Sequence, residues 1–307
     1  MTDQTRRASA IDPLRLLLAL SVIALHAGFP EAAPALVKQG LFNGLYRLAV
    51  PVFALISGYF FLSPLRSGRA GAYLRRIAAL YLLWMAIYLP IYGPDFSGPG
   101  HVLQTLVFGY FHLWFLPGLL VSAALVWALR APGRIAVVAG LMAAVGLVLQ
   151  YLVLSGAVQM QLDHYRNGLF TIFPFFATGL LLAQGWGARL TRLALPLAGL
   201  SLLAVIGESL IWYRIAGGGW GIDMMVSLLL AAPLLFLAAR QLQGGWDGKR
   251  LASVAAFVYF SHILMMITAS RFGLEGDTKA LVVMGLCLGI ALWLSVGERR
   301  RVLAFFT

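Results

Sequence analysis

The sequence predicts an all-α integral membrane protein, a bundle of about ten transmembrane helices with the N-terminus and the C-terminus both in the cytoplasm. Of its 307 residues, 61% are hydrophobic and only 11% are charged, whereas soluble domains have about 25% charged residues. Apolar runs follow one another along the whole chain, and no strand-like alternation competes with them. Residues 1–307 are therefore expected to form a single transmembrane domain.

The helices are predicted from the lengths of these runs, because about 20 apolar residues cross the roughly 30 Å hydrocarbon layer of a bilayer. The predicted spans are 13–29, 41–62, 72–91, 112–129, 135–154, 168–184, 191–212, 221–239, 251–271 and 279–296. In the first span, Asp12 is expected to be the N-cap and Pro13 to lie in the first turn. "GPDFSGPGH", after the third span, is expected to be an outer loop.

The orientation follows from the basic residues, which concentrate in alternate connections. Sixteen lie in segments predicted to be cytoplasmic: Arg6, Arg7, Arg66, Arg69, Arg75, Arg76, Arg130, Arg134, Arg189, Arg192, Arg240, Lys249, Arg250, Arg299, Arg300 and Arg301. Six lie in the outer segments: Lys38, Arg47, Arg166, Arg214, Arg271 and Lys279. This asymmetry predicts the inside orientation of both termini. The net charge of +12 is thus mostly an orientation signal and does not indicate nucleic-acid binding.

One cysteine, Cys287, lies inside the last span, which excludes an internal disulfide and a cysteine-rich metal site. No metal site is expected.

Arg15 and His26 are the most informative polar residues, because both lie within the first span. They are eleven positions apart, which returns to within about 20° of the same helix face, roughly 16 Å further along the axis. Arg15 alone is equally well explained by snorkelling to headgroups, and His26 by an interfacial position. Their alignment on one face favours a functional cavity, since ionisable groups inside a membrane are rare and usually face one.

Further polar residues interrupt later spans. His262 is placed midway along the ninth, beside Ser261, and His112 and Trp114 at the outer start of the fourth, where an aromatic belt is the alternative. Arg47 is placed near the outside of the second span. Ser57 and Gly58 lie nearer the cytoplasm, where a glycine can instead permit close helix packing. Glu208 and Asp223, near outer helix ends, are candidates to orient a histidine or to bind sugar hydroxyls, although acids at loop ends are often simply solvated.

The ordered combination of these motifs resembles the acyltransferase-three family of integral membrane acyltransferases. The motifs are Arg15 and His26, then "RLAVPVFALISGYFF", "YLRRIAALY", "HLWFLPGLL", "FPFFATGLLLA" and "YFSHILMM". Arg15 and His26 match the arginine-histidine pair of the family's first helix, and Ser57-Gly58-Tyr59 matches its Ser-Gly-Phe type motif. The chain departs from members that have a Trp-Ser-Leu stretch ending in glutamate, since it has His112-Leu113-Trp114-Phe115-Leu116.

The resemblance implies transfer of an acyl group, commonly acetyl, from cytoplasmic acyl-coenzyme A to a hydroxyl of a surface carbohydrate or lipid-linked glycan, in a bacterial inner membrane. Acetyl-CoA would be a substrate, and no cofactor would be bound permanently. The expected catalytic residues are His26, Arg15 and His262. Donor-binding residues are expected to be Arg15, Ser57, Gly58, Arg69, Arg75 and Arg76, since arginine forks suit phosphate oxygens. Acceptor-binding residues are expected to be Arg47, His112, Trp114 and Glu208.

Two mechanisms and one rival function remain open at this stage. A histidine, with His26 as the candidate, can act as general base toward the sugar hydroxyl, or it can carry the acyl group as an acyl-histidine. The main rival is a polytopic exporter or flippase of a carbohydrate or lipid-linked sugar, which would also need a polar channel and aromatic platforms.

Overall fold

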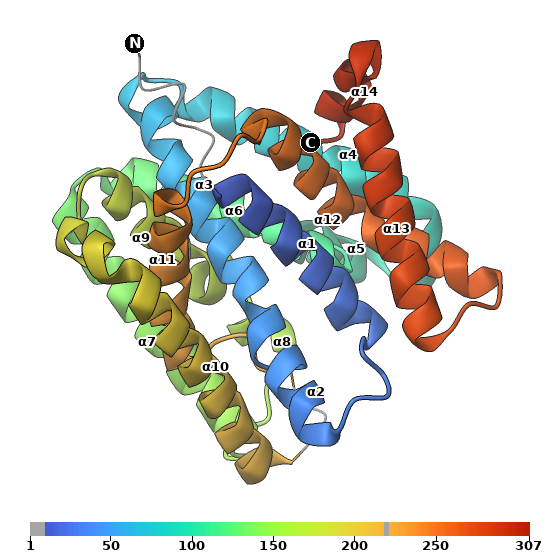
Figure 1. The fold of residues 1–307 in the computed structure, drawn as a ribbon, viewed down its shortest axis with the longest axis horizontal. Helices are drawn as coiled ribbons and strands as arrows, with labels where there is room; N and C mark the ends of the chain where they lie inside the picture. Colours follow the sequence, from blue (N-terminus) through green and yellow to red (C-terminus); the bar gives the residue numbers. More distant parts are fainter. Residues whose placement is uncertain (1–9, 218–220) are drawn as a thin grey trace.

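The computed structural model describes residues 10–217 and 221–307, and every regular element in these two ranges is a helix (Figure 1). Arg6 and Arg7, which the charge count assigns to the cytoplasm, lie outside the described residues. The helices are, in chain order, α1 (Ile11–Ala27), α2 (Ala35–Phe42), η2 (Leu45–Leu48), α3 (Ala49–Arg66), α4 (Ala70–Tyr92), η3 (Gly93–Asp95), α5 (Pro99–Phe108), η4 (Phe111–Trp114), α6 (Phe115–Leu129), α7 (Pro132–Leu154), α8 (Leu162–Tyr165), η5 (Gly168–Ile172), α9 (Phe173–Ala183), η6 (Ala188–Leu193), α10 (Ala194–Ala216), α11 (Val226–Gln241), α12 (Gly248–Arg271), α13 (Gly276–Leu294), η7 (Gly297–Arg299) and α14 (Arg300–Phe305).

The helical, membrane-spanning character predicted from the sequence is confirmed. Seven helical stretches are long and apolar enough to cross a membrane: Ala35–Arg66, Ala70–Asp95, Phe111–Leu129, Pro132–Leu154, Ala188–Ala216, Gly248–Arg271 and Gly276–Leu294. Two shorter apolar stretches are Gly168–Ala183 and Val226–Gln241, and α1 has 17 residues. These elements overlap all ten predicted spans.

The second predicted span, 41–62, lies within the helical stretch Ala35–Arg66 but contains a break that was not predicted. Helix α2 ends at Phe42, and α3 does not begin until Ala49. The Asn43 side chain stabilises this break, because its amide donates to Gln39 Oε1 at 3.0 Å and its oxygen accepts from the backbone amide of Ile222 at 3.2 Å. Asn43 therefore ties the turn to the segment that precedes α11.

Two smaller predictions also fail. The connection after α4 contains a helix of its own, α5, which begins with Pro99 in its first turn. Asp12 is not the N-cap of α1, because the helix begins at Ile11 with Ala10 in the cap position. Asp12 is buried instead, and its carboxylate accepts a hydrogen bond from Arg15.

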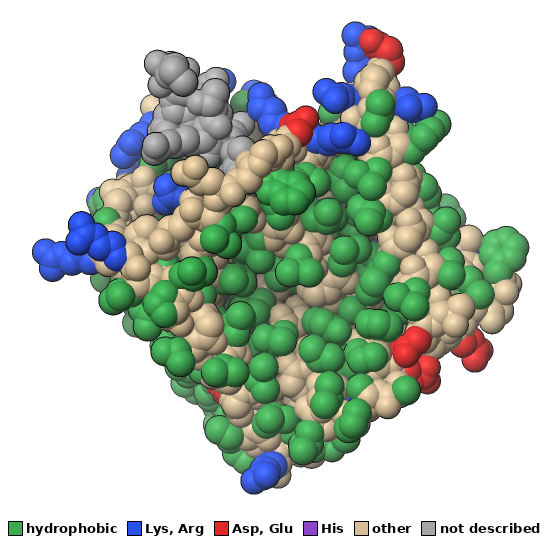
Figure 2. Space-filling view, in the orientation of Figure 1, with side chains coloured by type: hydrophobic (Ala, Val, Ile, Leu, Met, Phe, Trp, Pro, Cys, Tyr) green, Lys and Arg blue, Asp and Glu red, His purple; other side chains and the backbone are tan. Residues whose placement is uncertain are grey.

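One edge of the bundle collects basic residues. Helices α3 and α13 end there, α4 and α12 begin there, and α14 lies on it, along the upper side of Figure 1. The space-filling view shows a broad hydrophobic face with Lys and Arg side chains gathered along this edge (Figure 2). We call this edge the basic rim; its residues include Arg66, Arg69, Arg75, Arg76, Lys249, Arg250, Arg299, Arg300 and Arg301. The start of α1 and the end of α11 meet at the basic rim, where the Ala10 amide donates to the Leu242 carbonyl at 3.0 Å.

Helices α3 and α9 pack backbone to backbone through two glycines. A Cβ added at Gly58 would collide with the carbonyl oxygen of Phe176, and one added at Gly179 would collide with that of Leu55. Small residues allow such close approach between membrane helices, where packing rather than the hydrophobic effect drives association. The contact fixes α3, which carries Ser57 into the centre of the molecule.

Gly58→Ala is expected to destabilise the protein by about 2 kcal/mol, because the added methyl group meets rigid backbone atoms. The matched control is Gly140→Ala on α7, where a Cβ would meet no atom within 4 Å and where alanine favours helix by about 0.5–1 kcal/mol. Thermal unfolding of the detergent-purified variants measures both. Equal melting temperatures for the two variants would contradict the packing role of Gly58.

Candidate functional site

A cavity of about 380 Å³ enters the bundle from the basic rim, and we call it the inner cavity. Arg15 on α1, Arg76 on α4 and Lys249 on α12 line it, together with one carboxylate, that of Asp12. Farther in, the walls become apolar and aromatic: Phe53, Phe115, Leu116, Tyr259 and Phe260. The cavity therefore suits a ligand with an anionic end and a long, less polar arm.

Arg15 is held inside the bundle. Its Nη1 donates to Asp12 Oδ1 at 2.8 Å, and its guanidinium carbon lies 5.3 Å from the centre of the Phe60 ring. Only 21% of the side chain is exposed. This position favours the cavity interpretation of Arg15 over snorkelling, because a snorkelling side chain extends to the headgroups.

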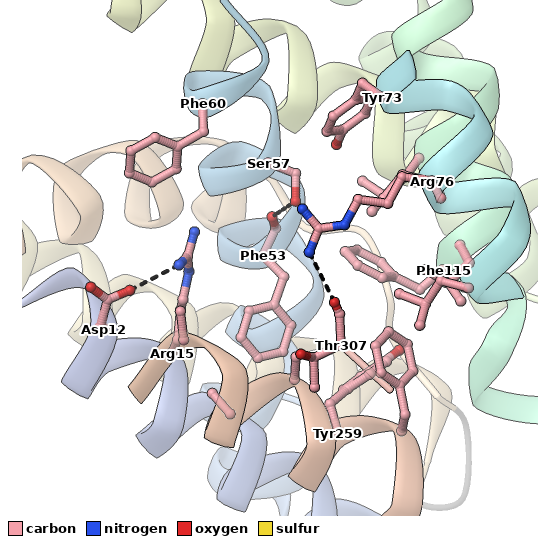
Figure 3. A pocket seen from close by; sticks show the side chains of 18 of the residues that line it. Asp12, Arg15, Phe53, Ser57, Phe60, Tyr73, Arg76, Phe115, Tyr259 and Thr307 are labelled. Atoms are coloured by element: carbon pink, nitrogen blue, oxygen red, sulfur yellow. Dashed lines mark hydrogen bonds and ion pairs between the residues drawn. The ribbon is translucent and has the colours of Figure 1, made fainter. Parts of the chain in front are cut away.

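Arg76 and Ser57 complete the polar part of the inner cavity. Arg76 Nη2 donates to the Thr307 carbonyl at 3.1 Å, and Ser57 Oγ donates to the Phe53 carbonyl at 2.8 Å. Arg15 and Arg76 extend into the cavity from opposite sides with Ser57 between them (Figure 3). Two fixed cations thus approach one space from two helices.

Three of the predicted donor-binding residues, Arg15, Ser57 and Arg76, meet in the inner cavity. Arg69 and Arg75 are exposed and do not line it, and Arg69 donates to Ser67 Oγ at 3.0 Å. Gly58 faces the backbone of α9. Their donor-binding roles stay predictions.

The sequence reasoning missed Tyr73 and Lys249 among the lining residues. A signal for the first was available, since Tyr73, Arg76, Ile77 and Leu80 are spaced as one helix face and all line the cavity. That spacing distinguishes Arg76 from its neighbour Arg75. Lys249 had no such signal in the sequence, because it is positioned by the start of α12.

Three histidines from distant parts of the chain meet beyond the apolar end of the inner cavity. The rings of His26 and His262 stack with centres 5.4 Å apart, and those of His112 and His262 meet edge to face at 4.8 Å. His112 is 3% exposed and His262 is fully buried. We call this group the histidine cluster; α1, η4 and α12 contribute one ring each.

Hydrogen bonds to backbone carbonyls fix the tautomers of the two buried histidines. His112 Nε2 lies 3.1 Å from the Phe260 carbonyl, and His262 Nδ1 lies 2.5 Å from that of Tyr259. A carbonyl only accepts, so these two nitrogens carry the hydrogens. His112 Nδ1 and His262 Nε2 have no hydrogen-bond partner among the described residues. In neutral rings these nitrogens carry the basic lone pairs.

Tyr88 fixes the segment of α12 that holds these carbonyls. Its hydroxyl donates to the Phe260 carbonyl at 2.8 Å and accepts from the Leu264 amide at 3.0 Å. Those two backbone groups are four residues apart, the pair that an α-helix normally joins. The hydroxyl therefore bonds to both groups, and the Phe260 carbonyl accepts from His112 as well.

Tyr259 separates the inner cavity from a smaller cavity of about 70 Å³ farther from the basic rim, and it lines both. Its hydroxyl donates to the His112 carbonyl at 2.9 Å. We call the smaller space the outer cavity. His26 and His112 line it, so the histidine cluster stands beside the wall that separates the outer cavity from the inner one.

The outer cavity also contains an ionic group built on Asp223. Arg47 Nη1 lies 2.7 Å from one Asp223 oxygen and Arg166 Nη1 lies 4.0 Å from the other. The Arg166 guanidinium carbon lies 5.2 Å from the centre of the Trp114 ring. Two cations share one carboxylate, which leaves a net positive charge in the cavity. Three of the predicted acceptor-binding residues, Arg47, His112 and Trp114, therefore meet there.

Glu208, the fourth predicted acceptor-binding residue, lies elsewhere. Its carboxylate accepts from the hydroxyl of Tyr151 and from the backbone amides of Val226 and Ser227, at 3.1 and 2.8 Å. These amides begin α11, so Glu208 satisfies donors that a helix start leaves unpaired. It lines neither cavity. Its acceptor-binding role stays a prediction, and this arrangement does not favour it.

Metal binding finds no support in the parts of the chain that the structure describes, where no group of three or more His, Cys, Asp or Glu side chains is placed to hold an ion. Imidazole nitrogens such as those of the histidine cluster can serve in proton transfer or nucleophilic attack.

Comparison with known proteins gives one match over nearly the whole chain. The model of the acyltransferase-three family, described as an acyltransferase domain, matches residues 9–297. Two proteins named amino-acid racemase, both from Enterococcus faecalis, are 28% identical over 131 residues and 31% identical over 135 residues. Each alignment covers 39% of this chain, and the chain spans only 18% and 19% of the length of these relatives. No solved structure matches the chain significantly.

Proposed function

Because the chain belongs to the acyltransferase-three family, we propose that this membrane acyltransferase moves an acyl group, such as acetyl, from cytoplasmic acyl-coenzyme A to a hydroxyl of an envelope carbohydrate. The acceptor would be a surface polysaccharide or a lipid-linked glycan on the outer side of a bacterial inner membrane. The observation that carries the proposal is the histidine cluster at the boundary between a cationic inner cavity and a polar outer cavity.

The orientation belongs to this proposal. Ten spans, with the basic rim in the cytoplasm, place the inner cavity where acyl-coenzyme A is found and the outer cavity on the opposite side. The start of α1 and the helix α14 lie on the same edge (Figure 1), which agrees with inside positions for both ends of the described chain.

The donor would enter from the basic rim. Its phosphates would meet Arg76, Lys249 and Arg15, whose charges suit phosphate oxygens. The pantetheine arm would follow the aromatic walls at Phe53 and Phe115. The thioester would then stand against Tyr259, the side chain that both cavities share.

The transfer itself needs a base, since a sugar hydroxyl is a poor nucleophile at neutral pH. As its oxygen attacks the thioester carbon, an imidazole takes the hydroxyl proton, the carbon–sulfur bond breaks, and the coenzyme A thiolate leaves and is protonated. His26 is our candidate base, because its ring lines the outer cavity. Tyr259 must turn aside for the two reactants to meet. The acyl-histidine route remains the alternative, with His262 Nε2 as the unpartnered nucleophile.

The rival reading, export of a carbohydrate, gains less support from this geometry. A glycan crossing the protein would need a continuous path, whereas the Tyr259 hydroxyl is bonded to the backbone of η4 between the two cavities. An acyl group on a slender arm needs only a small opening there. The racemase name of the relatives is not carried over, because the alignments span under a fifth of those proteins.

The proposed orientation predicts that reporter fusions within 93–98 report an outer location and those within 244–247 a cytoplasmic one, because the basic connections stay inside. Alkaline phosphatase and fluorescent-protein fusions at each point provide the measurement. Both segments on one side would rule out this orientation.

Arg76→Gln is expected to weaken acyl-coenzyme A binding about tenfold, because a charge-assisted hydrogen bond to phosphate contributes about 1.5–3 kcal/mol. Arg75→Gln is the matched control: the same change at the adjacent arginine, which does not line the inner cavity, should leave the affinity near wild type. Calorimetric titration of acetyl-CoA into the detergent-purified proteins measures both. Equal affinities would remove Arg76 from the donor site.

His26→Ala is expected to lower product formation by about 10²–10⁴-fold, the range for loss of a general base, while acetyl-CoA still binds. His101→Ala, an exposed histidine on α5, is the control and should retain turnover. The measurement is radiolabelled acetyl transfer per folded molecule, to glycan acceptors from bacterial envelopes. Near wild-type turnover of His26→Ala would remove it as the base.

His262→Ala separates the two mechanisms in the same assay. If labelled acetyl stays on wild-type protein incubated without acceptor, and His262→Ala abolishes that label, the acyl-histidine route replaces the general-base route.

A further inference from the structure

A second space reaches the histidine cluster from the outer side. This outer groove, of about 550 Å³, is lined by His26, Tyr110, Phe111, Ile263, Met266, Ile267, Ser270, Arg271 and Lys279. His26 and Phe111 belong to the outer cavity as well. The groove is therefore a separate approach to the same histidine.

One face of α12 forms the floor of the outer groove. Its residues Ile263, Met266, Ile267, Ser270 and Arg271 recur at the spacing of a single helix stripe. From Ile263 to Arg271 the helix rises about 12 Å. The floor is apolar near the histidine cluster and becomes polar and then cationic toward the outer end.

The inner end of the groove offers flat aromatic surfaces beside the histidine. The Phe111 ring lies 5.0 Å from that of His26, and 52% of Phe111 is exposed. Tyr110 adjoins it, with ring centres 6.2 Å apart. Aromatic faces of this kind pack against the apolar faces of sugar rings, which makes this end suitable for the sugar that carries the reacting hydroxyl.

Two cations line the outer end of the groove. Arg271 and Lys279 both line it, no Asp or Glu is among the lining residues, and neither cation forms an ion pair with a residue that the structure describes. The neighbouring carboxylate of Asp277 accepts from the Glu31 amide at 2.6 Å. Glu31, Glu275 and Asp277 lie at the adjoining start of α13 but do not line the groove, so Arg271 and Lys279 are the charged groups that a ligand in the groove would meet.

We propose that Arg271 and Lys279 form a subsite for an anionic group, a carboxylate or a phosphate, on a saccharide acceptor whose acylated sugar lies against Phe111 and His26. The inference rests on the proposed function, and it names the acceptor class as acidic oligosaccharides. The rise of about 12 Å along the floor suits a disaccharide spacing between the anionic group and the reacting hydroxyl. Charge complementarity at the mouth then selects the acceptor and sets its register in the groove.

The test compares hyaluronan-derived tetrasaccharides with the same preparation after reduction of its carboxylates to alcohols. Wild-type protein in phosphatidylcholine nanodiscs is expected to bind the acidic form about tenfold more tightly and to acetylate it with about tenfold higher kcat/KM. Arg271→Gln/Lys279→Gln is expected to bring both ratios close to one. The matched control, Lys38→Gln/Arg214→Gln, removes two outer charges that do not line the groove and should retain both ratios.

The outcomes separate this inference from the function on which it rests. Preferential binding of the acidic form without any acetyl transfer would overturn the acyltransferase proposal and leave the subsite standing. Equal binding of both forms by the wild type, or an unchanged preference in Arg271→Gln/Lys279→Gln, would overturn the subsite. Addition of anionic phosphatidylglycerol provides a second readout. If it raises the melting temperature of the wild type but not of that double variant, and saccharide binding is equal in the two, the cations serve lipid headgroups and the subsite is overturned.

Discussion

Hydrogen bonds to the carbonyl of Phe260 join α4 and η4 to α12 at the centre of this protein. Inside a bilayer no water is present to satisfy a backbone group, so each such group needs a partner within the protein. Tyr88 and His112 both donate to this carbonyl, and the Tyr88 hydroxyl returns a bond to the Leu264 amide. These bonds to α12 fix a tyrosine from α4 and a histidine from η4 against the helix that carries His262.

The other parts of the site depend on the same segment of α12. Tyr259 precedes Phe260 and is tied to the His112 backbone, so the wall between the two cavities and the histidine cluster share one segment of α12. The His262 ring is bonded to the Tyr259 carbonyl and stacks on His26. Residues 259–262 of α12 therefore supply the aromatic side chain that both cavities share and one of the three histidines. Under the proposed function, the acyl group crosses the wall between the cavities while donor and acceptor remain on their own sides.

The close contact of α3 with α9 has a different physical origin. Gly58 and Gly179 bring the two backbones together, and this contact sets the depth at which Ser57 faces the inner cavity. The Ser57-Gly58 pair thus combines a residue that lines a cavity with one that allows packing. The family resemblance alone could not tell which of the two residues has which role, because a sequence motif does not show which side of the helix each residue faces.

The sequence by itself determined that the chain is a bundle of apolar helices, because hydrocarbon thickness and backbone hydrogen bonding leave little choice for apolar runs of this length. It also placed Arg15 and His26 on one face of α1, since helical periodicity is local. The break in the second span at Asn43 was not predicted, because it depends on a bond to Ile222 far along the chain. Only the tertiary structure decided which polar residues meet. His26, His112 and His262 come together, and Arg76 lines the inner cavity whereas Arg75 does not. Glu208 binds the backbone amides at the start of α11. Those outcomes depend on how helices distant in sequence rotate and pack against one another, and hydrophobic periodicity carries little information about partners.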